Sequence, residues 1–586
     1  MKENGFTCRL YNRKLNALLA ALLTALSPVY AGGEDFSASE VNLSKTRLGW
    51  GTVLTGKVIS QPVRTSRGFV APHEGNGLTA FSENGKILWQ TAFPEGISPY
   101  LTATHGDMLY LVTGGTKLSL LQNDGKKAWT KDSGFVITES PMPGRDGRVF
   151  ARGKDEIACF GTKGTIRWKK IIKEQNEDIP LSQLDKGSVF LFASDGAYTV
   201  SPFGEIRGPF KTDFQVEHAD TTDFGALVTF SDGSISLFTE NDGVPQQKWM
   251  LPGDGKKTHL ITRGFDRGKA AILSDGKITL IRTDTGKTIT SFPVHGSPAT
   301  LKHAERTTQG IILISGKNAS CYTDTGLIEW SADFPDKKKW THIIPSDQGF
   351  LIFCTTGWTL EAYRVKQLPA TQGLTSFSTP EPGLYSELYG KTDKVSSISQ
   401  GRAVNESLSA EMKKAFSEGG FGQKEKDWLP LLTNEMNAIG TAWNQSIAQT
   451  QTELPYFATH TDYAKEVVEL AASTETLAFQ KPLSLLIRRN KNPRRLESLV
   501  KAAGIIAWDP GYLMMTELGK VAEKFNENDE LLELVCDATL EICRFMGKEA
   551  FVEKGRGILT AMISLKYSRA IREYARVTME KILNFQ

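Results

Sequence analysis

The fold of this 586-residue chain is decided by a repeated unit, whose clearest copy is Leu78-Thr79-Ala80-Phe81-Ser82-Glu83-Asn84-Gly85-Lys86-Ile87-Leu88-Trp89. A short strand runs into an Asn-Gly turn, and a second strand leaves the turn and carries a tryptophan. Asn-Gly or Asp-Gly between apolar strands is the strongest local signal of a β-hairpin, because both central residues of the tight turn need a positive φ angle. The stretch therefore predicts a hairpin closed by a tryptophan strand.

The tryptophan position recurs about every forty residues, which is the size of one four-stranded propeller blade. Gly208 and Thr290 occupy this position in two of the units. In the other six the residues are Trp50, Trp89, Trp129, Trp168, Trp249 and Trp330. We interpret these six as structural residues that dock one blade against the next, since each indole buries a large apolar area.

The last unit lacks its tryptophan strand. A hairpin around Trp358 is followed directly by Lys366-Gln367-Leu368-Pro369, whereas residues 47–58, which include Trp50, match the strand around Trp89. We therefore expect the N-terminal strand to complete the last blade, which closes the ring and leaves no open sheet edge. The sequence predicts an all-β, eight-bladed β-propeller over residues 47–366.

The repeated unit resembles the PQQ-like, or quinoprotein-like, β-propeller repeats, whose pattern is a strand, Asp-Gly, Leu-Tyr-Ala-Leu-Asp, Gly-Lys and then Trp. The resemblance covers residues 47–366, and residues 78–89 are its closest copy. The family mixes quinone-dependent dehydrogenases with BamB-like propellers that bind no cofactor and act as scaffolds. The resemblance thus implies the fold, and we expect the chain to belong to the BamB-like, non-enzymatic branch.

The alternative of a PQQ-type quinoprotein oxidoreductase is disfavoured by the cysteines. The quinone-dependent enzymes of the family hold their cofactor with an adjacent-cysteine disulfide, a calcium ion and a catalytic aspartate. If this chain resembled them in function, it would need a Cys-Cys pair, and it has none. His-Glu-x-x-His, Gly-x-Ser-x-Gly, P-loop and Cys-x-x-Cys motifs are also missing. The eight histidines show no metal-ligand spacing. We therefore predict no catalytic, cofactor-binding or metal-binding residues, and no cofactor.

Residues 1–31 have the features of a cleavable secretory signal peptide. Arg9, Arg13 and Lys14 precede an apolar run that begins at Leu15, and small residues precede a cleavage site after Ala31. The run is too short for a secure membrane span, although an uncleaved anchor is the alternative interpretation. We expect a secreted protein, periplasmic or associated with the cell envelope, with no membrane span in the mature chain.

Charge argues against a nucleic-acid partner. Cleavage after Ala31 would remove four basic residues and one acidic residue, so the formal net charge falls from +3 to 0. A neutral chain gives no electrostatic case for binding a phosphate backbone. Cys8 precedes the apolar run, so it cannot be a lipidated cysteine of the kind that BamB-like proteins carry.

The sequence pattern changes after Tyr363. Residues 367–405 are rich in Pro, Ser, Thr and Gly and show no sustained period, which is typical of a linker. Residues 406–586 have a helical period; Leu531, Val535 and Ala538, for example, fall on one face. The region weakly resembles HEAT or armadillo-type helical repeats. We expect an all-α domain that is either α-solenoid-like, with a groove for partners, or a compact bundle.

Five basic residues lie within eight positions of this region. They are Arg488, Arg489, Lys491, Arg494 and Arg495. One interpretation is a solvated loop between helices. The other is a contact site for phosphate groups, acidic lipid headgroups or an acidic partner surface.

Together these patterns predict an exported, non-enzymatic interaction or scaffold protein of the cell envelope. Propeller and helical domain are each expected to bind protein partners, with BamB-like support of outer-membrane protein assembly as the concrete form. An oxidoreductase would instead need a polar, deep central pocket. A carbohydrate or peptidoglycan-binding module would need exposed aromatic residues, for which Trp358, Tyr385 and Tyr389 are candidates. The sequence identifies neither the partner nor a small-molecule ligand.

Overall fold

The computed structural model describes residues 39–42, 48–261, 268–294, 301–307, 310–333, 340–365, 404, 406–418, 424–445 and 461–585. The predicted signal peptide, and all of the predicted linker except Val404, lie outside these residues. By internal contacts the chain divides into two units, Met1–Glu40 and Val41–Gln586. The short strand β1 (Ser39–Asn42) lies at this boundary, and the fold described below is that of the second unit.

Eight antiparallel sheets correspond to the eight predicted blades. The first four contain β3 (Val63–Thr65), β4 (Gly68–His73), β5 (Gly77–Phe81) and β6 (Ile87–Ala92); β7 (Ile97–Ala103), β8 (Leu109–Thr113), β9 (Lys117–Leu121) and β10 (Lys127–Asp132); β11 (Met142–Pro143), β12 (Val149–Arg152), β13 (Glu156–Phe160) and β14 (Ile166–Ile171); β15 (Ser182–Gln183), β16 (Val189–Ala193), β17 (Gly196–Val200) and β18 (Ile206–Phe210).

The remaining four contain β19 (Val216–Thr222), β20 (Gly225–Phe230), β21 (Ile235–Asn241) and β22 (Val244–Leu251); β23 (Thr258–Ile261), β24 (Lys269–Ser274), β25 (Lys277–Arg282) and β26 (Thr288–Pro293); β27 (Leu301–Thr307), β28 (Gly310–Ser315), β29 (Asn318–Tyr322) and β30 (Ile328–Asp333); β31 (Trp340–Pro345), β32 (Phe350–Thr355), β33 (Thr359–Arg364) and β2 (Leu48–Val53). The first strands of neighbouring blades contact one another, for example β3 with β7 and β27 with β31, so these strands surround the central channel.

The last blade takes its outer strand from the start of the propeller. β2 pairs antiparallel with β33, with Leu48 opposite Tyr363 and Val53 opposite Thr359. The sheet order is accordingly β2-β33-β32-β31. The prediction of an eight-bladed propeller closed by the N-terminal strand is confirmed.

Tryptophans of the repeat lie on the turn of the following blade. The Trp50 indole donates from Nε1 to the Glu83 carbonyl oxygen at 3.1 Å. Gly85 in the same turn has a φ of 81°, and a Cβ atom placed there would lie 2.3 Å from the Trp50 ring. The turn therefore requires glycine for its backbone angle and for the close approach of the indole. The same bond to a turn carbonyl is made by Trp89, Trp129, Trp168 and Trp249.

The two positions without tryptophan are filled in different ways. Beside Thr290, Phe292 packs on the next turn, since a Cβ on Gly326 would lie 2.4 Å from the Phe292 ring. Beside Gly208, the Arg207 guanidinium covers the next turn, because its Nε would lie 3.2 Å from a Cβ on Gly243. Trp330 is fully buried among side chains of the last two blades.

The C-terminal region is all-α, as predicted. Its helices are α3 (Glu406–Glu418), α4 (Glu425–Gln445), α6 (Thr461–Ala472), α7 (Gln480–Arg489), α8 (Pro493–Ile506), α9 (Leu513–Lys524), α10 (Asp529–Met546), α11 (Lys548–Ala550), α12 (Arg556–Met562) and α13 (Arg569–Phe585). Local signals set their starts: Asn492 and Asn528 accept hydrogen bonds from the first turns of α8 and α10, and Pro493 opens α8.

These helices stack as antiparallel pairs. Along one layer α6 contacts α8, α8 contacts α10 and α10 contacts α13; along the other α4 contacts α7, α7 contacts α9 and α9 contacts α12. Gly504 of α8 allows the close approach of α10, since a Cβ there would lie 3.2 Å from the Ala538 Cα. Among the described helices the principal contacts of each pair are with its neighbours, which is the arrangement of an α-solenoid and not of a compact bundle.

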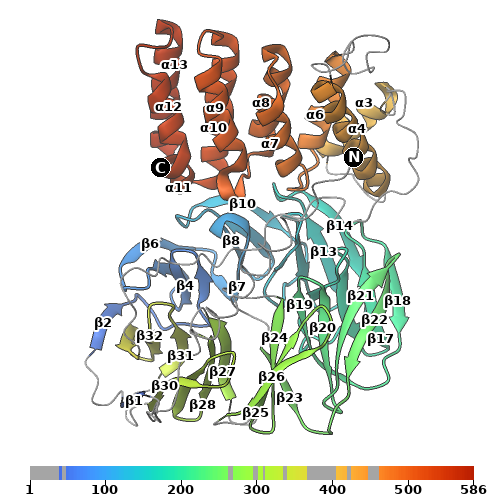
Figure 1. Ribbon diagram of the computed structural model, residues 1–586, viewed down its shortest axis with the longest axis vertical. Helices are drawn as coiled ribbons and strands as arrows, with labels where there is room; N and C mark the ends of the chain where they lie inside the picture. The colour runs from blue at the N-terminus through green and yellow to red at the C-terminus, as the bar shows by residue number, and fades with distance from the viewer. Residues whose placement is uncertain are drawn as a thin grey trace, which may run out of the picture. The chain divides into compact units, whose positions relative to one another are not determined.

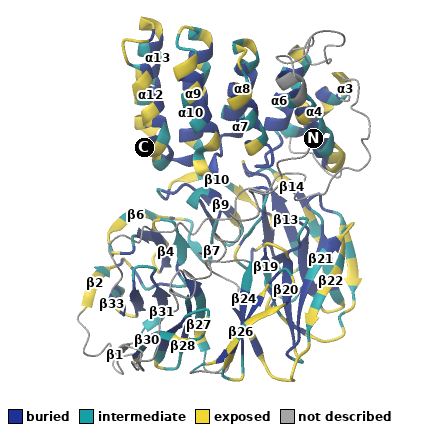
Figure 2. Cartoon of the chain, viewed as in Figure 1, coloured by how far each residue is buried: buried dark blue, intermediate teal, exposed yellow. Residues whose placement is uncertain are grey.

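The helical stack stands on one face of the propeller, with its pairs side by side above β10 and β14 (Figure 1). Buried residues fill the blades and the helix interfaces, whereas the outer strands β2 and β22 are largely exposed (Figure 2). The propeller and the stack therefore meet along the turns of only a few blades.

Candidate functional site

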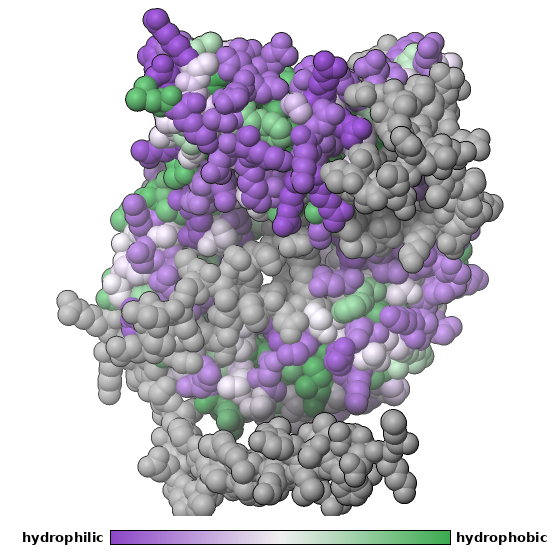
Figure 3. Space-filling model, turned by 45° about the horizontal axis from the view of Figure 1, so that its top comes forward, coloured by the Kyte–Doolittle hydropathy of each residue, from purple (hydrophilic) through white to green (hydrophobic). Residues whose placement is uncertain are grey.

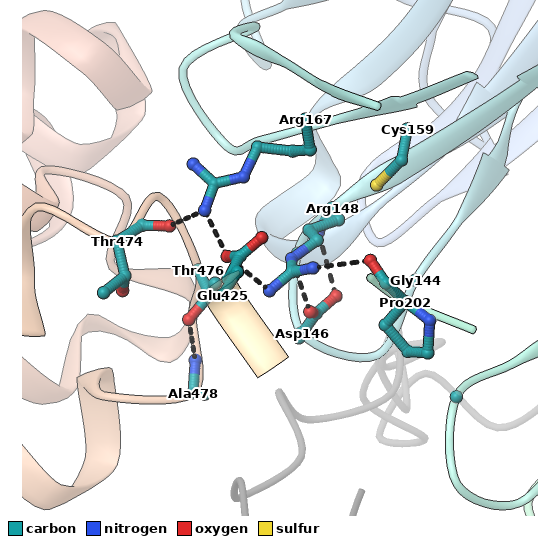
Figure 4. A network of polar contacts seen from close by, with 12 residues as sticks. Gly144, Asp146, Arg148, Cys159, Arg167, Pro202, Glu425, Thr474, Thr476 and Ala478 are labelled. Atoms are coloured by element: carbon teal, nitrogen blue, oxygen red, sulfur yellow. Dashed lines mark hydrogen bonds and ion pairs between the residues drawn. The ribbon is translucent and has the colours of Figure 1, made fainter. Parts of the chain in front are cut away.

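A buried ion-pair cluster joins the helical stack to the third blade (Figure 4). Glu425, the first residue of α4, accepts a hydrogen bond on Oε1 from Arg148 Nη2 at 2.9 Å and another from Arg167 Nη2. Asp146 Oδ2 lies 2.9 Å from Arg148 Nε. All four side chains are at most 3% exposed. The two positive charges are balanced by two negative charges, which such a buried cluster needs in order to be stable.

Arg148 connects three elements through one guanidinium group. It lies in the turn between β11 and β12, and its Nη1 donates to the Pro202 carbonyl of the fourth blade at 2.9 Å. The guanidinium carbon is 5.6 Å from the centre of the Phe203 ring. Glu425 stands at the N-terminus of α4, where the helix dipole stabilises a carboxylate. The cluster thus fixes α4 against two blades at once.

The link between α6 and α7 packs on the same blade. The Leu477 N–H donates to the Asp146 carbonyl at 2.7 Å, and Thr165 Oγ1 donates to Glu475 Oε1 at 2.6 Å. Gly147 has a φ of 81°, and a Cβ there would lie 2.6 Å from Leu477 Cγ. This turn is shaped to receive the helical link.

A third contact joins the stack to the second blade. Trp508, fully buried between α8 and α9, donates from Nε1 to the His105 carbonyl at 3.2 Å. Gln122 Nε2 donates to the carbonyls of Arg544 and Phe545 at 2.7 and 3.1 Å. These carbonyls belong to the last turn of α10, where helical partners are lacking, so Gln122 caps the helix from the propeller.

One apolar cluster runs through the whole junction. It includes Tyr110, Leu120 and Phe160 of the second and third blades together with Leu432 and Leu499 of the stack. Continuous burial of this kind is typical of a domain core and contrasts with the polar interfaces of mobile domains. The helical stack and the propeller therefore share one apolar core.

A second charged cluster lies at the closure of the ring. Arg64 of the innermost strand β3 pairs with Asp347 at 2.9 Å, with Glu305 at 3.2 Å and with Glu83 at 3.4 Å, so it bridges the first, seventh and eighth blades. Burial raises the pKa of Glu83 from its usual 4.5 to about 7, against the opposing effect of Arg64. This cluster reinforces the closure made by β2.

The innermost strands begin on the propeller face opposite the helices, which we call the channel mouth. The turns that meet the helices, residues 105–107 and 144–148, follow the innermost strands β7 and β11. All innermost strands run in the same direction around a propeller, so their starting ends open on the face away from the helices. The beginnings of β19 and β23 lie at this mouth.

A polar pocket of about 360 Å³ lies there, between the fourth, fifth and sixth blades. Its charged and ionisable lining residues are Asp178, Glu217, His218, Lys257 and His259. Burial is the largest cause of a lowered pKa of His259, and neighbouring His218 adds to it. Both acidic and basic groups are thus available to a ligand in this pocket.

Two of these histidines belong to a series that our sequence analysis missed. Successive innermost strands β19, β23, β27 and β31 each carry one histidine opposite the penultimate residue of the next strand. The pairs are His218 with Thr229, His259 with Leu273, His303 with Ile314 and His342 with Cys354. Their recurrence at the blade period was the available signal, and a search for metal-ligand spacing could not detect it.

The predicted basic residues lie at the far tip of the α7–α8 pair. α7 begins next to the junction and runs away from it, so its C-terminal end and the start of α8 are remote from the propeller (Figure 1). Arg488, Arg489, Lys491 and Arg494 are exposed. Arg495 instead lies over the Trp443 ring, 5.2 Å from its centre. The surface on the helical side is predominantly hydrophilic (Figure 3).

The remaining sequence candidates are distributed over the molecule. Trp358 is 50% exposed at a φ of 64°, while Tyr385 and Tyr389 lie outside the described residues. The five cysteines after Cys8 are all buried and none of them forms a disulfide bond: Cys159, Cys321, Cys354, Cys536 and Cys543. Among the described residues, no three His, Cys, Asp or Glu side chains are placed to hold a metal ion.

Within the described part of the chain, no helix combines the length and apolar character of a membrane span.

Comparison with known proteins gives a family match and distant structural similarities. The sequence profile of the family described as Outer membrane protein assembly factor BamB matches residues 22–135 and 119–356, more than half of the chain. Comparison with curated protein sequences found no match. The structure is similar to BamB from Moraxella catarrhalis, with 13% identity and a TM-score of 0.40 over 55% of this chain and 98% of that one.

Two further solved structures are similar over about half of this chain. The C-terminal WD40 domain of Sif2 has 11% identity and a TM-score of 0.42 over 56% of this chain and 99% of that one. Sqt1 of Saccharomyces cerevisiae has 10% identity and a TM-score of 0.38 over 55% and 100%. By the extent of the family match, the chain belongs to the family described as Outer membrane protein assembly factor BamB.

Proposed function

We propose that this chain is an exported, non-enzymatic scaffold that holds protein partners of the cell envelope in a fixed arrangement. The observation that carries the proposal is the junction, where a BamB-family propeller is joined to a helical stack by a buried ion-pair cluster and a continuous apolar core. A flexible connection would allow the two parts to act independently. A buried junction fixes their relative orientation, which is useful to a protein that positions one partner against another.

Support of outer-membrane protein assembly is the specific role that we propose. It rests on the family membership and on the signal-like residues 1–31, which would direct the chain to the envelope. The closed propeller offers the loops of one face to a partner, and the helical stack offers a second surface. The exposed basic tip of Arg488, Arg489, Lys491 and Arg494 is the part of that surface that we assign to an acidic partner.

The experiment is chemical cross-linking in intact cells, followed by affinity purification of the tagged full chain and identification of the captured proteins. We expect an outer-membrane barrel protein or a component of its assembly machinery among them. Capture of neither, by a chain shown to be folded and exported, would contradict the proposal.

The basic tip is tested in the same experiment with a charge-reversed variant. Arg488→Glu with Arg489→Glu should reduce capture of the partner that contacts the stack. Arg556→Glu with Arg569→Glu makes the same change in charge on exposed residues of α12 and α13 and serves as the control. An equal loss in both variants would assign the effect to net charge and contradict a specific contact at the tip.

A further inference from the structure

Two buried hydroxyl groups line the channel-mouth pocket without a hydrogen-bond partner among the described residues. Thr229 is 1% exposed and Thr258 is 8% exposed, and neither Oγ1 atom has such a partner. Both residues line the pocket of about 360 Å³. A buried hydroxyl without a partner destabilises the fold, so two of them in one polar pocket indicate atoms arranged for a ligand.

A buried arginine holds the wall of the pocket that is formed by residues 176–179. Arg152 is fully buried and donates to the carbonyls of Asn176 at 3.2 Å, Ile179 at 3.1 Å and Glu177 at 3.3 Å. The turn that contributes Asp178 is thereby fixed before any ligand arrives. A preformed polar site binds with a smaller loss of conformational entropy than a flexible one.

The charges of the pocket define the chemistry of its ligand. Lys257, with His218 and His259 beside it, can bind a carboxylate, and Asp178 with Glu217 can bind an ammonium group. The volume lies at the lower end of the range of small-molecule sites. We propose that the channel-mouth pocket binds a small zwitterionic ligand of the amino-acid or short-peptide class, with the Thr229 and Thr258 hydroxyls as additional hydrogen-bonding groups.

The test is isothermal titration calorimetry of the full chain with glycylglycine. N-acetylglycylglycine, which lacks the ammonium group, and glycylglycinamide, which lacks the carboxylate, are the comparison probes. Each should bind about tenfold more weakly or worse, because a charged hydrogen bond is lost. Lys257→Ala should remove the preference for glycylglycine over glycylglycinamide, and Asp178→Asn should reduce the preference over the acetylated probe. Both residues are exposed, so both variants should fold.

A threonine variant separates ligand binding from a structural role. Thr229→Val should weaken glycylglycine binding without lowering the unfolding midpoint, because the lost hydroxyl makes no hydrogen bond to the described residues. Thr113→Val is the matched control: Thr113 is also fully buried, and its hydroxyl likewise has no partner in the part of the chain that the structure describes, but it lies in the second blade. It should leave binding unchanged. Absence of binding up to about 10 mM glycylglycine, equal affinity for all three probes, or equal effects of the two threonine variants would overturn the proposal.

Discussion

Replacement of Glu425 by glutamine should release α4 from the propeller. The variant keeps the size of the side chain and removes the one negative charge that Arg148 and Arg167 share. Asp146 can then balance only Arg148, so the cluster carries a net positive charge while it remains buried. Removal of one partner from a buried ion pair costs about 3–5 kcal/mol. We expect a loss of this size in the free energy of α4 opening.

Native-state hydrogen exchange measures this quantity for each helix. The opening free energy of α4 and of the segment 474–477 should fall, whereas that of α13, which is remote from the cluster, should stay unchanged. Lys426→Gln is the control in the neighbouring residue. Its ion pair with Glu205, at 3.0 Å, is partly exposed, so its loss should cost less than about 1 kcal/mol.

Restoration of charge balance provides a second test of the same reasoning. Addition of Arg167→Met to Glu425→Gln leaves Arg148 paired with Asp146 and should recover part of the lost stability, with a coupling of about 0.5–3 kcal/mol. An opening free energy of α4 in Glu425→Gln that equals that of Lys426→Gln would refute the role given to the cluster. So would a double variant that is the sum of its single variants.

Three further outcomes follow from other parts of the molecule. Burial raises the pKa values of Glu83 and Glu139 from 4.5 to about 7, so the folded chain binds more protons than the unfolded chain between these pH values. The free energy of unfolding measured in urea should therefore fall as the pH rises through this window. Glu83→Gln should reduce the slope of unfolding free energy against pH, and an unchanged slope would be the contrary result. Gly85→Ala places a Cβ against Trp50 and should lower the unfolding free energy by more than Gly115→Ala, which has a similar φ and nothing within 4 Å, and should exceed the conformational cost of about 1 kcal/mol. Gln122→Ala removes two bonds to the end of α10 and should cost about 1–3 kcal/mol in thermal unfolding, whereas an unchanged midpoint would mean that water caps the helix equally well.

The propeller could be predicted from the sequence because its determinants are local and repeated. Trp89 and Gly85 are close in sequence, and the same spacing returns in later units. Helices such as α10 could be predicted from their apolar period in the same way. That these helices stack in pairs depends on small contacts such as Gly504 with Ala538, which have no local signature.

The junction and the pocket could not be predicted. Arg148 and Glu425 are separated by 277 residues, and each is an ordinary surface residue type until the fold buries it. That the hydroxyls of Thr229 and Thr258 have no hydrogen-bond partner among the described residues is a property of three-dimensional packing alone. The histidines were visible as a series at the blade period, but their significance depends on the innermost strands that carry them.

The pairing of β2 with β33 has a consequence for the biogenesis of the molecule. Leu48 of β2 pairs with Tyr363 of β33, so the whole propeller has to be synthesised before β2 can pair. Contacts between such distant residues form slowly, and until β33 is made and pairs, β2 has an unpaired edge that other chains can reach. A chain whose synthesis stops within the last blade would therefore have an unclosed propeller with an unpaired strand edge. This intermediate therefore needs protection from other chains until β2 has paired with β33.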